Sequence, residues 1–112
     1  MKYEEEIQEK GLVGPRITEE HVERKISRTL YHLFPDTEVT VCCLILENGY
    51  SVTGTSACAS PENFDVDLGK KIAFDKASQK IWGLEAYLLK ERMSSGSVIL
   101  GEEADAVYFG KR

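Results

Sequence analysis

The residues with the most obvious chemical potential are three cysteines and two histidines, which together could bind zinc or activate a thiol. Cys42, Cys43 and Cys58 lack the spacing of a zinc site, and His21 and His32 lie far from them in sequence. A catalytic cysteine needs an exposed thiolate beside a base, whereas Cys43 and Cys58 are predicted on an apolar strand face. The pattern therefore predicts no metal site and no catalytic cysteine. Both histidines are expected at the surface or at helix caps.

Carboxylates could also do chemistry, and Glu62, Asp65 and Asp67 stand close together in a turn-rich connector. They precede a long helical pattern, however, and negative charge at a helix N-terminus is favoured by the helix dipole. Neither a Gly-x-Gly-x-x-Gly nor a Walker pattern is present. We therefore expect a protein that is not an enzyme and needs no cofactor. The alternative is a small nucleotide-hydrolysing enzyme that uses Glu62, Asp65 or Glu85.

Composition limits the possible partners. The chain has 112 residues, a formal net charge of −5 and 42% hydrophobic residues, which is typical of one globular domain. Duplex nucleic acid is an unsuitable partner because its affinity comes from many Lys and Arg contacts with phosphates. No apolar run is long enough to cross a membrane, and cysteines without a pairing pattern favour a reducing cytoplasm. A small anionic ligand is still compatible with this charge.

The elements that must position any site begin with a hairpin over residues 38–59. Two strand-like runs meet at Asn48 and Gly49, a pair that favours a two-residue type I′ turn. Counting outward from that turn sets Ile45 opposite Val52 and Cys43 opposite Gly54. The predicted buried face then consists of Val39, Val41, Cys43, Ile45, Tyr50, Val52 and Cys58.

Two helices are predicted around the hairpin. The first is capped by Thr18 and runs to about Phe34, where Pro35 follows. The second runs from about Asp67 to Met93, with a kink or close crossing expected at Gly83. It carries two apolar tracks, wider than one sheet face can cover. We therefore expect a homo-oligomer packed through the second track, whose interface residues are Phe74, Trp82, Ala86 and Leu89.

The organisation that follows is an α+β fold, in which an antiparallel sheet packs on a long C-terminal helix and an N-terminal helix precedes it. Residues 1–16 form a tail or a frayed helix, interrupted by Gly11, Gly14 and Pro15. Residues 17–112 form a single domain, and residues 94–112 hold two short apolar runs that could pair as a second hairpin.

The hairpin, connector and second helix together resemble a family of small tailed-phage proteins. The residues that carry the resemblance are the run from Val39 to Asp65, the segment Leu68-Gly-Lys-Lys-Ile-Ala, and the stretch from Lys80 to Arg92. The resemblance extends to the first-described Thoeris anti-defence sponges, which that family is taken to include. The resemblance implies a phage protein that binds and sequesters glyco-cyclic ADP-ribose, and in some members cyclic di- or trinucleotides, without degrading them. It also implies dimers that can assemble into hexamers, with ligand pockets between subunits.

The resemblance further assigns candidate ligand-binding residues. Asn63 and Phe64 in the connector match positions for base stacking, and Arg92 at the end of the second helix matches a phosphate-binding position, to which we add Lys71. An aromatic face, a forked cation and exclusion of water suit a cyclic ligand that contains pyrophosphate. Besides the hydrolase, a structural factor or one that binds a host protein is the other alternative.

Overall fold

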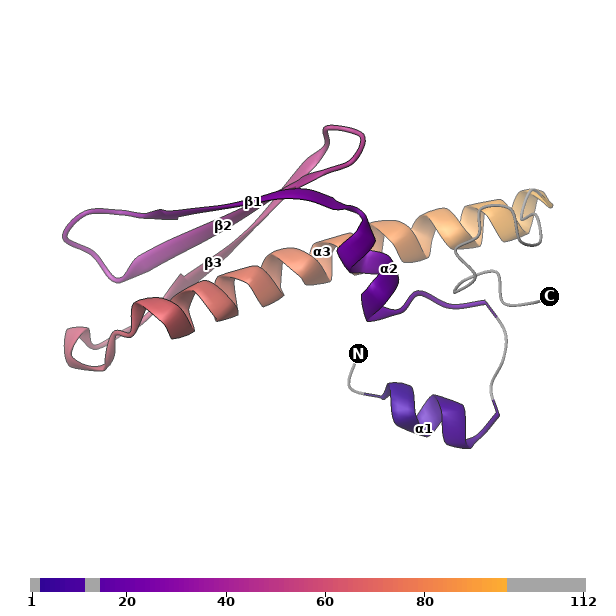
Figure 1. The fold of residues 1–112 in the computed structure, drawn as a ribbon, viewed down its shortest axis with the longest axis horizontal. Helices are drawn as coiled ribbons and strands as arrows, with labels where there is room; N and C mark the ends of the chain where they lie inside the picture. The colour runs from indigo at the N-terminus through magenta and orange to yellow at the C-terminus, as the bar shows by residue number, and fades with distance from the viewer. Residues whose placement is uncertain (1–2, 12–14, 97–112) are drawn as a thin grey trace. The chain divides into compact units, whose positions relative to one another are not determined.

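The computed structural model describes residues 3–11 and 15–96. Its elements in chain order are α1 (Glu4–Glu9), α2 (Glu19–Arg24), β1 (Ile26–Leu33), β2 (Val39–Leu46), β3 (Ser51–Ala57), the 3-10 helix η1 (Pro61–Asn63) and α3 (Val66–Ser95) (Figure 1). A three-stranded antiparallel sheet with a long C-terminal helix confirms the predicted α+β class. The chain divides into a sheet unit, Lys25–Ile81, and a terminal unit formed by Met1–Arg24 and Trp82–Arg112.

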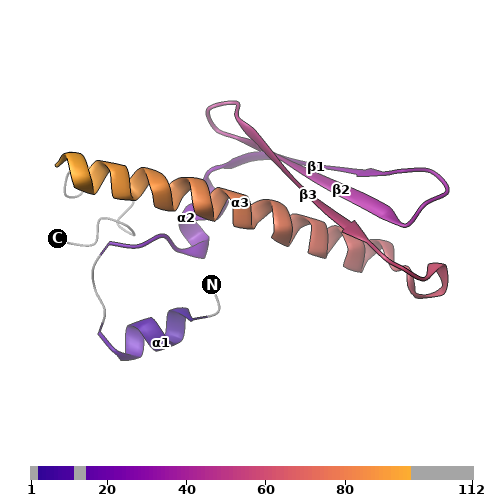
Figure 2. The same cartoon turned by 180° about the vertical axis from the view of Figure 1, so that it is seen from behind.

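In the sheet unit, the strands follow the order β1-β2-β3, and one sheet face is buried beneath the first half of α3 (Figures 1 and 2). Small side chains recur every fourth residue along the buried side of the helix, which brings it close to the sheet. We call the buried side of the sheet the inner face and the helix residues packed on it the helical cover. The buried residues are Thr40, Cys42, Leu44, Leu46, Val52, Gly54 and Ser56 on the strands and Gly69, Ala73, Ala77 and Ile81 on α3.

Helix and sheet approach each other closely at Gly54 in β3. A Cβ atom built on Gly54 would lie 2.3 Å from the carbonyl oxygen of Ala73 and 2.4 Å from the backbone nitrogen of Ala77. No side chain fits in that space, so only glycine allows this packing. Nearby, the buried hydroxyl of Thr40 has no hydrogen-bond partner among the described residues.

The hairpin is present, but its predicted register was wrong by one residue. Leu44 pairs with Val52 and Cys42 with Gly54, and the strands are joined by a three-residue loop. Within the described residues, Gly49 has a positive φ of 90° and Asn48 does not. A single positive φ suits a type I turn followed by a glycine, and this turn gives a loop one residue longer than the predicted two-residue turn. The extra residue shifts the register by one, so the opposite face of β2 is directed toward the core.

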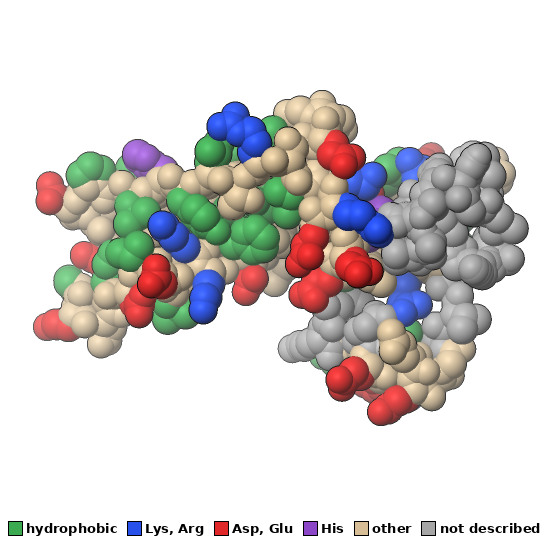
Figure 3. Space-filling model, in the orientation of Figure 1, with side chains coloured by type: hydrophobic (Ala, Val, Ile, Leu, Met, Phe, Trp, Pro, Cys, Tyr) green, Lys and Arg blue, Asp and Glu red, His purple; other side chains and the backbone are tan. Residues whose placement is uncertain are grey.

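The inverted register changes which side chains are buried. Cys42, not Cys43, lies in the core, and Val39, Val41, Cys43 and Ile45 occupy the outer face in half-buried positions. Figure 3 shows hydrophobic side chains gathered in patches over the sheet unit, with lysine and arginine side chains among them.

The first predicted helix was wrong over most of its length. The helix α2 ends at Arg24, and residues Ile26–Leu33 form strand β1, paired with β2. The apolar spacing of Val22, Ile26, Leu30 and Leu33 fits a helix, yet residues 26 to 33 also include Thr29 and Tyr31, which favour strands. Pairing with β2 satisfies the backbone groups of every second residue in this segment and overrides the helical period.

The second helix was predicted correctly, and Val66–Ser95 is helical without interruption through Gly83. Of the first apolar track, Ala73, Ala77 and Ile81 are buried, while Leu84 and Leu88 are exposed. The structure describes one chain, so association through the second track stays a prediction.

The terminal unit comprises α1, α2 and the second half of α3. Here α1 falls within the predicted tail of residues 1–16, and most of the predicted second hairpin lies outside the described residues. The division at residue 17 stays a prediction. No described helix is both long and apolar enough to cross a membrane.

Candidate ligand-binding site

A hollow lies on the surface of the terminal unit. It has a volume of about 360 Å³, and one stripe of α3 forms most of its wall. The stripe arises because residues three or four positions apart share a helix face. The lining residues are Ile17, Trp82, Ala86, Leu89 and Met93, with the cationic side chains of Arg16 and Lys90 among them.

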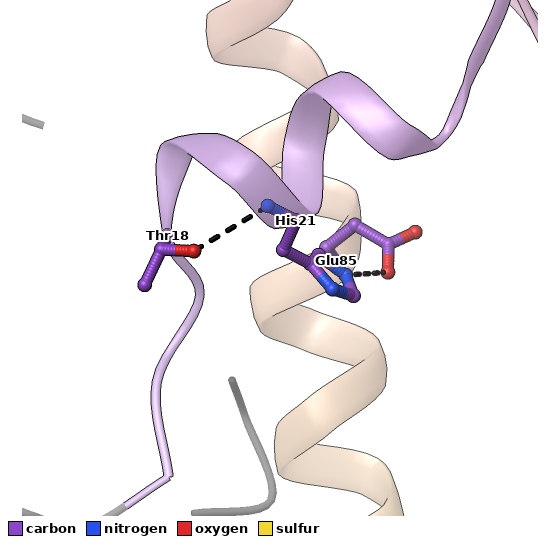
Figure 4. Close-up of polar contacts among 3 residues, drawn as sticks. All are labelled: Thr18, His21 and Glu85. Atoms are coloured by element: carbon purple, nitrogen blue, oxygen red, sulfur yellow. Dashed lines mark hydrogen bonds and ion pairs between the residues drawn. The ribbon is translucent and has the colours of Figure 1, made fainter. Parts of the chain in front are cut away.

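Ile17 and the start of α2 are held beside α3 by a buried polar contact (Figure 4). His21 is fully buried, and its Nε2 lies 2.8 Å from Oε1 of Glu85, whose side chain is largely shielded. The backbone N–H of His21 also donates to the hydroxyl of Thr18 over 3.4 Å. The predicted surface or capping role of His21 was wrong, because its ring is a core group with a carboxylate partner.

The hollow can accommodate a ligand with an aromatic part and an anionic part. The half-buried indole of Trp82 offers a face on which a base can stack. Arg16 and Lys90 are the basic residues of the lining, and no carboxylate lines the hollow among the described residues. Apolar walls with a few polar groups are typical of small-molecule sites.

The four residues predicted to bind the ligand are divided between the two units. Asn63, Phe64 and Lys71 belong to the sheet unit, whereas Arg92 belongs to the terminal unit. Asn63 and Lys71 are exposed, and Arg92 is half-buried in the last turn of α3 but does not line the hollow. Their joint action on one ligand stays a prediction.

Phe64 lies at the end of η1 and is half-buried. Its Cε1 atom would be 3.7 Å from a Cβ atom built on Gly69, so part of the ring packs against the start of α3. The remaining exposed part is still available for stacking.

Three of the four predicted interface residues, Trp82, Ala86 and Leu89, line the hollow, while Phe74 is half-buried in the sheet unit. Sequence reasoning placed them on one stripe but missed that Arg16 and Lys90 would flank it. Lys90 lies four positions after Ala86 and three before Met93, so its spacing could have predicted that it shares the helix face of the stripe. No feature of the sequence predicted that Arg16 would line the hollow.

The acidic residues that the hydrolase alternative would use, Glu62, Asp65 and Glu85, each contact another residue of the chain. The hydroxyl of Ser60 donates to Glu62 over 2.6 Å and holds the pKa of that carboxyl below its usual range, which disfavours it as a general acid. Asp65 accepts from the backbone N–H of Leu68 at the start of α3, and Glu85 contacts the buried His21.

The cysteines are free thiols in the sheet unit. Burial raises the pKa of Cys42, and Cys43 next to it adds to the rise, so the Cys42 thiol stays protonated near neutral pH. Within residues 3–11 and 15–96, no group of three or more His, Cys, Asp or Glu side chains is placed to hold a metal ion.

Comparison with known proteins places the chain in a family. The sequence model of the phage protein family of N4 Gp49 and phage Sf6 gene 66 matches residues 17–93. The chain belongs to this family. The match begins just before α2 and ends within the last turns of α3, so the N4 Gp49 family region contains the whole sheet and nearly all of the hollow. No curated protein and no solved structure matches the chain.

Proposed function

We propose that this phage protein binds a cyclic nucleotide immune signal, of the glyco-cyclic ADP-ribose or cyclic dinucleotide type, and sequesters it without cleaving it. Such a sponge would block host immunity of the Thoeris type from within the bacterial cytoplasm. The resemblance of the hairpin, connector and second helix to phage sponge proteins suggests the class of ligand, and membership of a phage family is compatible with it.

The observation that carries the proposal is the hollow, whose lining includes Trp82 and the basic residues Arg16 and Lys90. In this proposal, Trp82 stacks on a base, while Lys90 and Arg16 contact phosphate oxygens. Charge-assisted hydrogen bonds to phosphate are about twice as strong as neutral ones. A sponge requires affinity alone, which agrees with the structural contacts made by Glu62, Asp65 and Glu85.

The test is calorimetry of the purified protein with glyco-cyclic ADP-ribose and with cyclic dinucleotides. We expect Lys90→Ala to weaken binding by about ten- to a hundred-fold, because one charge-assisted contact contributes about 1.5–3 kcal/mol. Lys80→Ala is the matched control, since Lys80 is an exposed lysine of the same helix outside the hollow. Arg92→Ala tests the site suggested by the family resemblance in the same experiment.

Each result has a separate meaning. Unchanged affinity in Lys90→Ala rejects the hollow as the site, and the absence of binding by the unmodified protein rejects the function. Ligand released by heating should be chemically intact, whereas a hydrolase would release product.

A further inference from the structure

The strand β1 is an edge of the sheet, and no other strand of the described residues pairs with its outer side. It lies at one end of the order β1-β2-β3, and residues 27–32 are all exposed. Edge strands offer unpaired backbone groups to other strands and are usually blocked by proline or a bulge. Here the only irregularity of the β1–β2 pairing is confined to Ile26–Arg28, and no proline interrupts the strand.

Hydrogen bonding to β2 determines which backbone groups of β1 point outward. The N–H of Phe34 donates to the carbonyl of Val39 over 3.2 Å, so this is a hydrogen-bonded pair. Such pairs alternate along an antiparallel ladder. Counting back, Thr29, Tyr31 and Leu33 are the residues of β1 whose N–H and C=O groups point away from β2.

The side chains of the same residues lie over an uncovered part of the inner face. Tyr31 pairs with the buried Cys42, yet Tyr31 is 39% exposed. The helix α3 packs tightly on Gly54, on the opposite edge strand. The ammonium group of Lys70 lies 5.3 Å from the Tyr31 ring and leaves much of the ring uncovered. This edge therefore has both backbone groups and apolar surface to bury.

We propose that β1 pairs antiparallel with β1 of a second copy of this chain, with Tyr31 opposite Tyr31 of the second copy. The two three-stranded sheets then become one continuous sheet. In this register Thr29 is opposite Leu33, and these pairs together with Tyr31 exchange about six backbone hydrogen bonds, two for each hydrogen-bonded pair.

Side-chain pairing favours this register over its neighbour. It sets Leu30 opposite His32 and Arg28 opposite Phe34, so no like charges face each other. A two-residue shift that centres the pairing on Leu30 would oppose Arg28 and His32. The two-fold symmetry is of the isologous kind found in most homodimers.

The other sheet edge is a poorer partner. The residues of β3 with outward backbone groups include Ser51, Thr53 and Thr55, which are exposed and polar. Pairing there would bury less apolar surface than pairing through Tyr31, Leu30 and Leu33. This difference supplies a matched control.

The test compares Thr29→Pro with Thr53→Pro by analytical ultracentrifugation of the full chain. Both threonines are exposed edge residues whose N–H points outward, so proline removes no hydrogen bond of the sheet itself. We expect Thr29→Pro to halve the mass of the assembly and Thr53→Pro to leave it unchanged. A wild type that sediments as a monomer, or equal masses for both variants, overturns the proposal.

A second pair of variants applies if Thr29→Pro fails to fold by circular dichroism. Tyr31→Glu places two carboxylates opposite each other at the two-fold axis, while Lys70 compensates the new charge within each chain. We expect Tyr31→Glu and Tyr31→Arg each to lose the β1 contact when alone. Their mixture should regain the mass of the wild-type assembly. A mixture that stays dissociated, or a Tyr31→Glu protein of wild-type mass, overturns the pairing.

Discussion

Gly54 shows how one residue sets the distance between the sheet and its helix. A Cβ atom at this position would lie too close to the backbone atoms of Ala73 and Ala77, so no side chain fits there. We expect Gly54→Ala to lower the free energy of unfolding by about 1–3 kcal/mol, because backbone atoms on both elements must move apart. Urea denaturation followed by circular dichroism measures this change.

Gly83→Ala is the control for that measurement. Gly83 is exposed in the interior of α3, and nothing lies within 4 Å of a Cβ atom built there. Alanine should therefore stabilise the helix by about 1 kcal/mol. A Gly54→Ala protein as stable as Gly83→Ala would contradict the close packing of β3 on α3.

At the same scale, single residues explain the error in the hairpin register. Asn48 and Gly49 correctly indicated a turn, but they do not fix how many residues it contains. The polar residue Thr40 on the inner face made the opposite face of β2 look more apolar. Burial of Thr40 without a partner is a cost that a pattern of hydrophobic residues cannot anticipate.

At the scale of elements, α2 and α3 are joined by the contact between His21 and Glu85. We expect Glu85→Ala to lower the free energy of unfolding by about 1–3 kcal/mol, since it removes an acceptor from a buried polar ring. Glu91→Ala, an exposed acid of the same helix, should change it little. Denaturation monitored by the fluorescence of Trp82 reads this effect, and equal stabilities of the two variants would show that the contact is dispensable.

The helices and strands were predictable where the apolar residues follow a single helical or strand period. The helix α3 follows from its long apolar pattern, and β2 and β3 from alternation on either side of a turn. The strand β1 was missed because its apolar spacing also fits a helix and its own side chains are mostly exposed. The hollow was only partly predictable, because Arg16 reaches it through the fold and not through spacing.

At the scale of the whole molecule, association through α3 is a separate prediction from the β1 pairing. Ala86 is exposed on the predicted interface stripe, so Ala86→Glu should reduce the mass of the assembly without unfolding the chain. Gln79→Glu, an exposed position off the stripe, is the control. Sedimentation of both variants provides the measurement, and identical masses would remove α3 from the interface.

The distribution of two rare residue types across the units has a practical consequence. The single tryptophan, Trp82, belongs to the terminal unit, and all three cysteines belong to the sheet unit. Indole emission therefore reports on one half of the protein, and alkylation of the buried Cys42 reports on the other. The natural chain thus carries two independent internal probes, with which the cooperativity between its halves can be measured without introducing any label site.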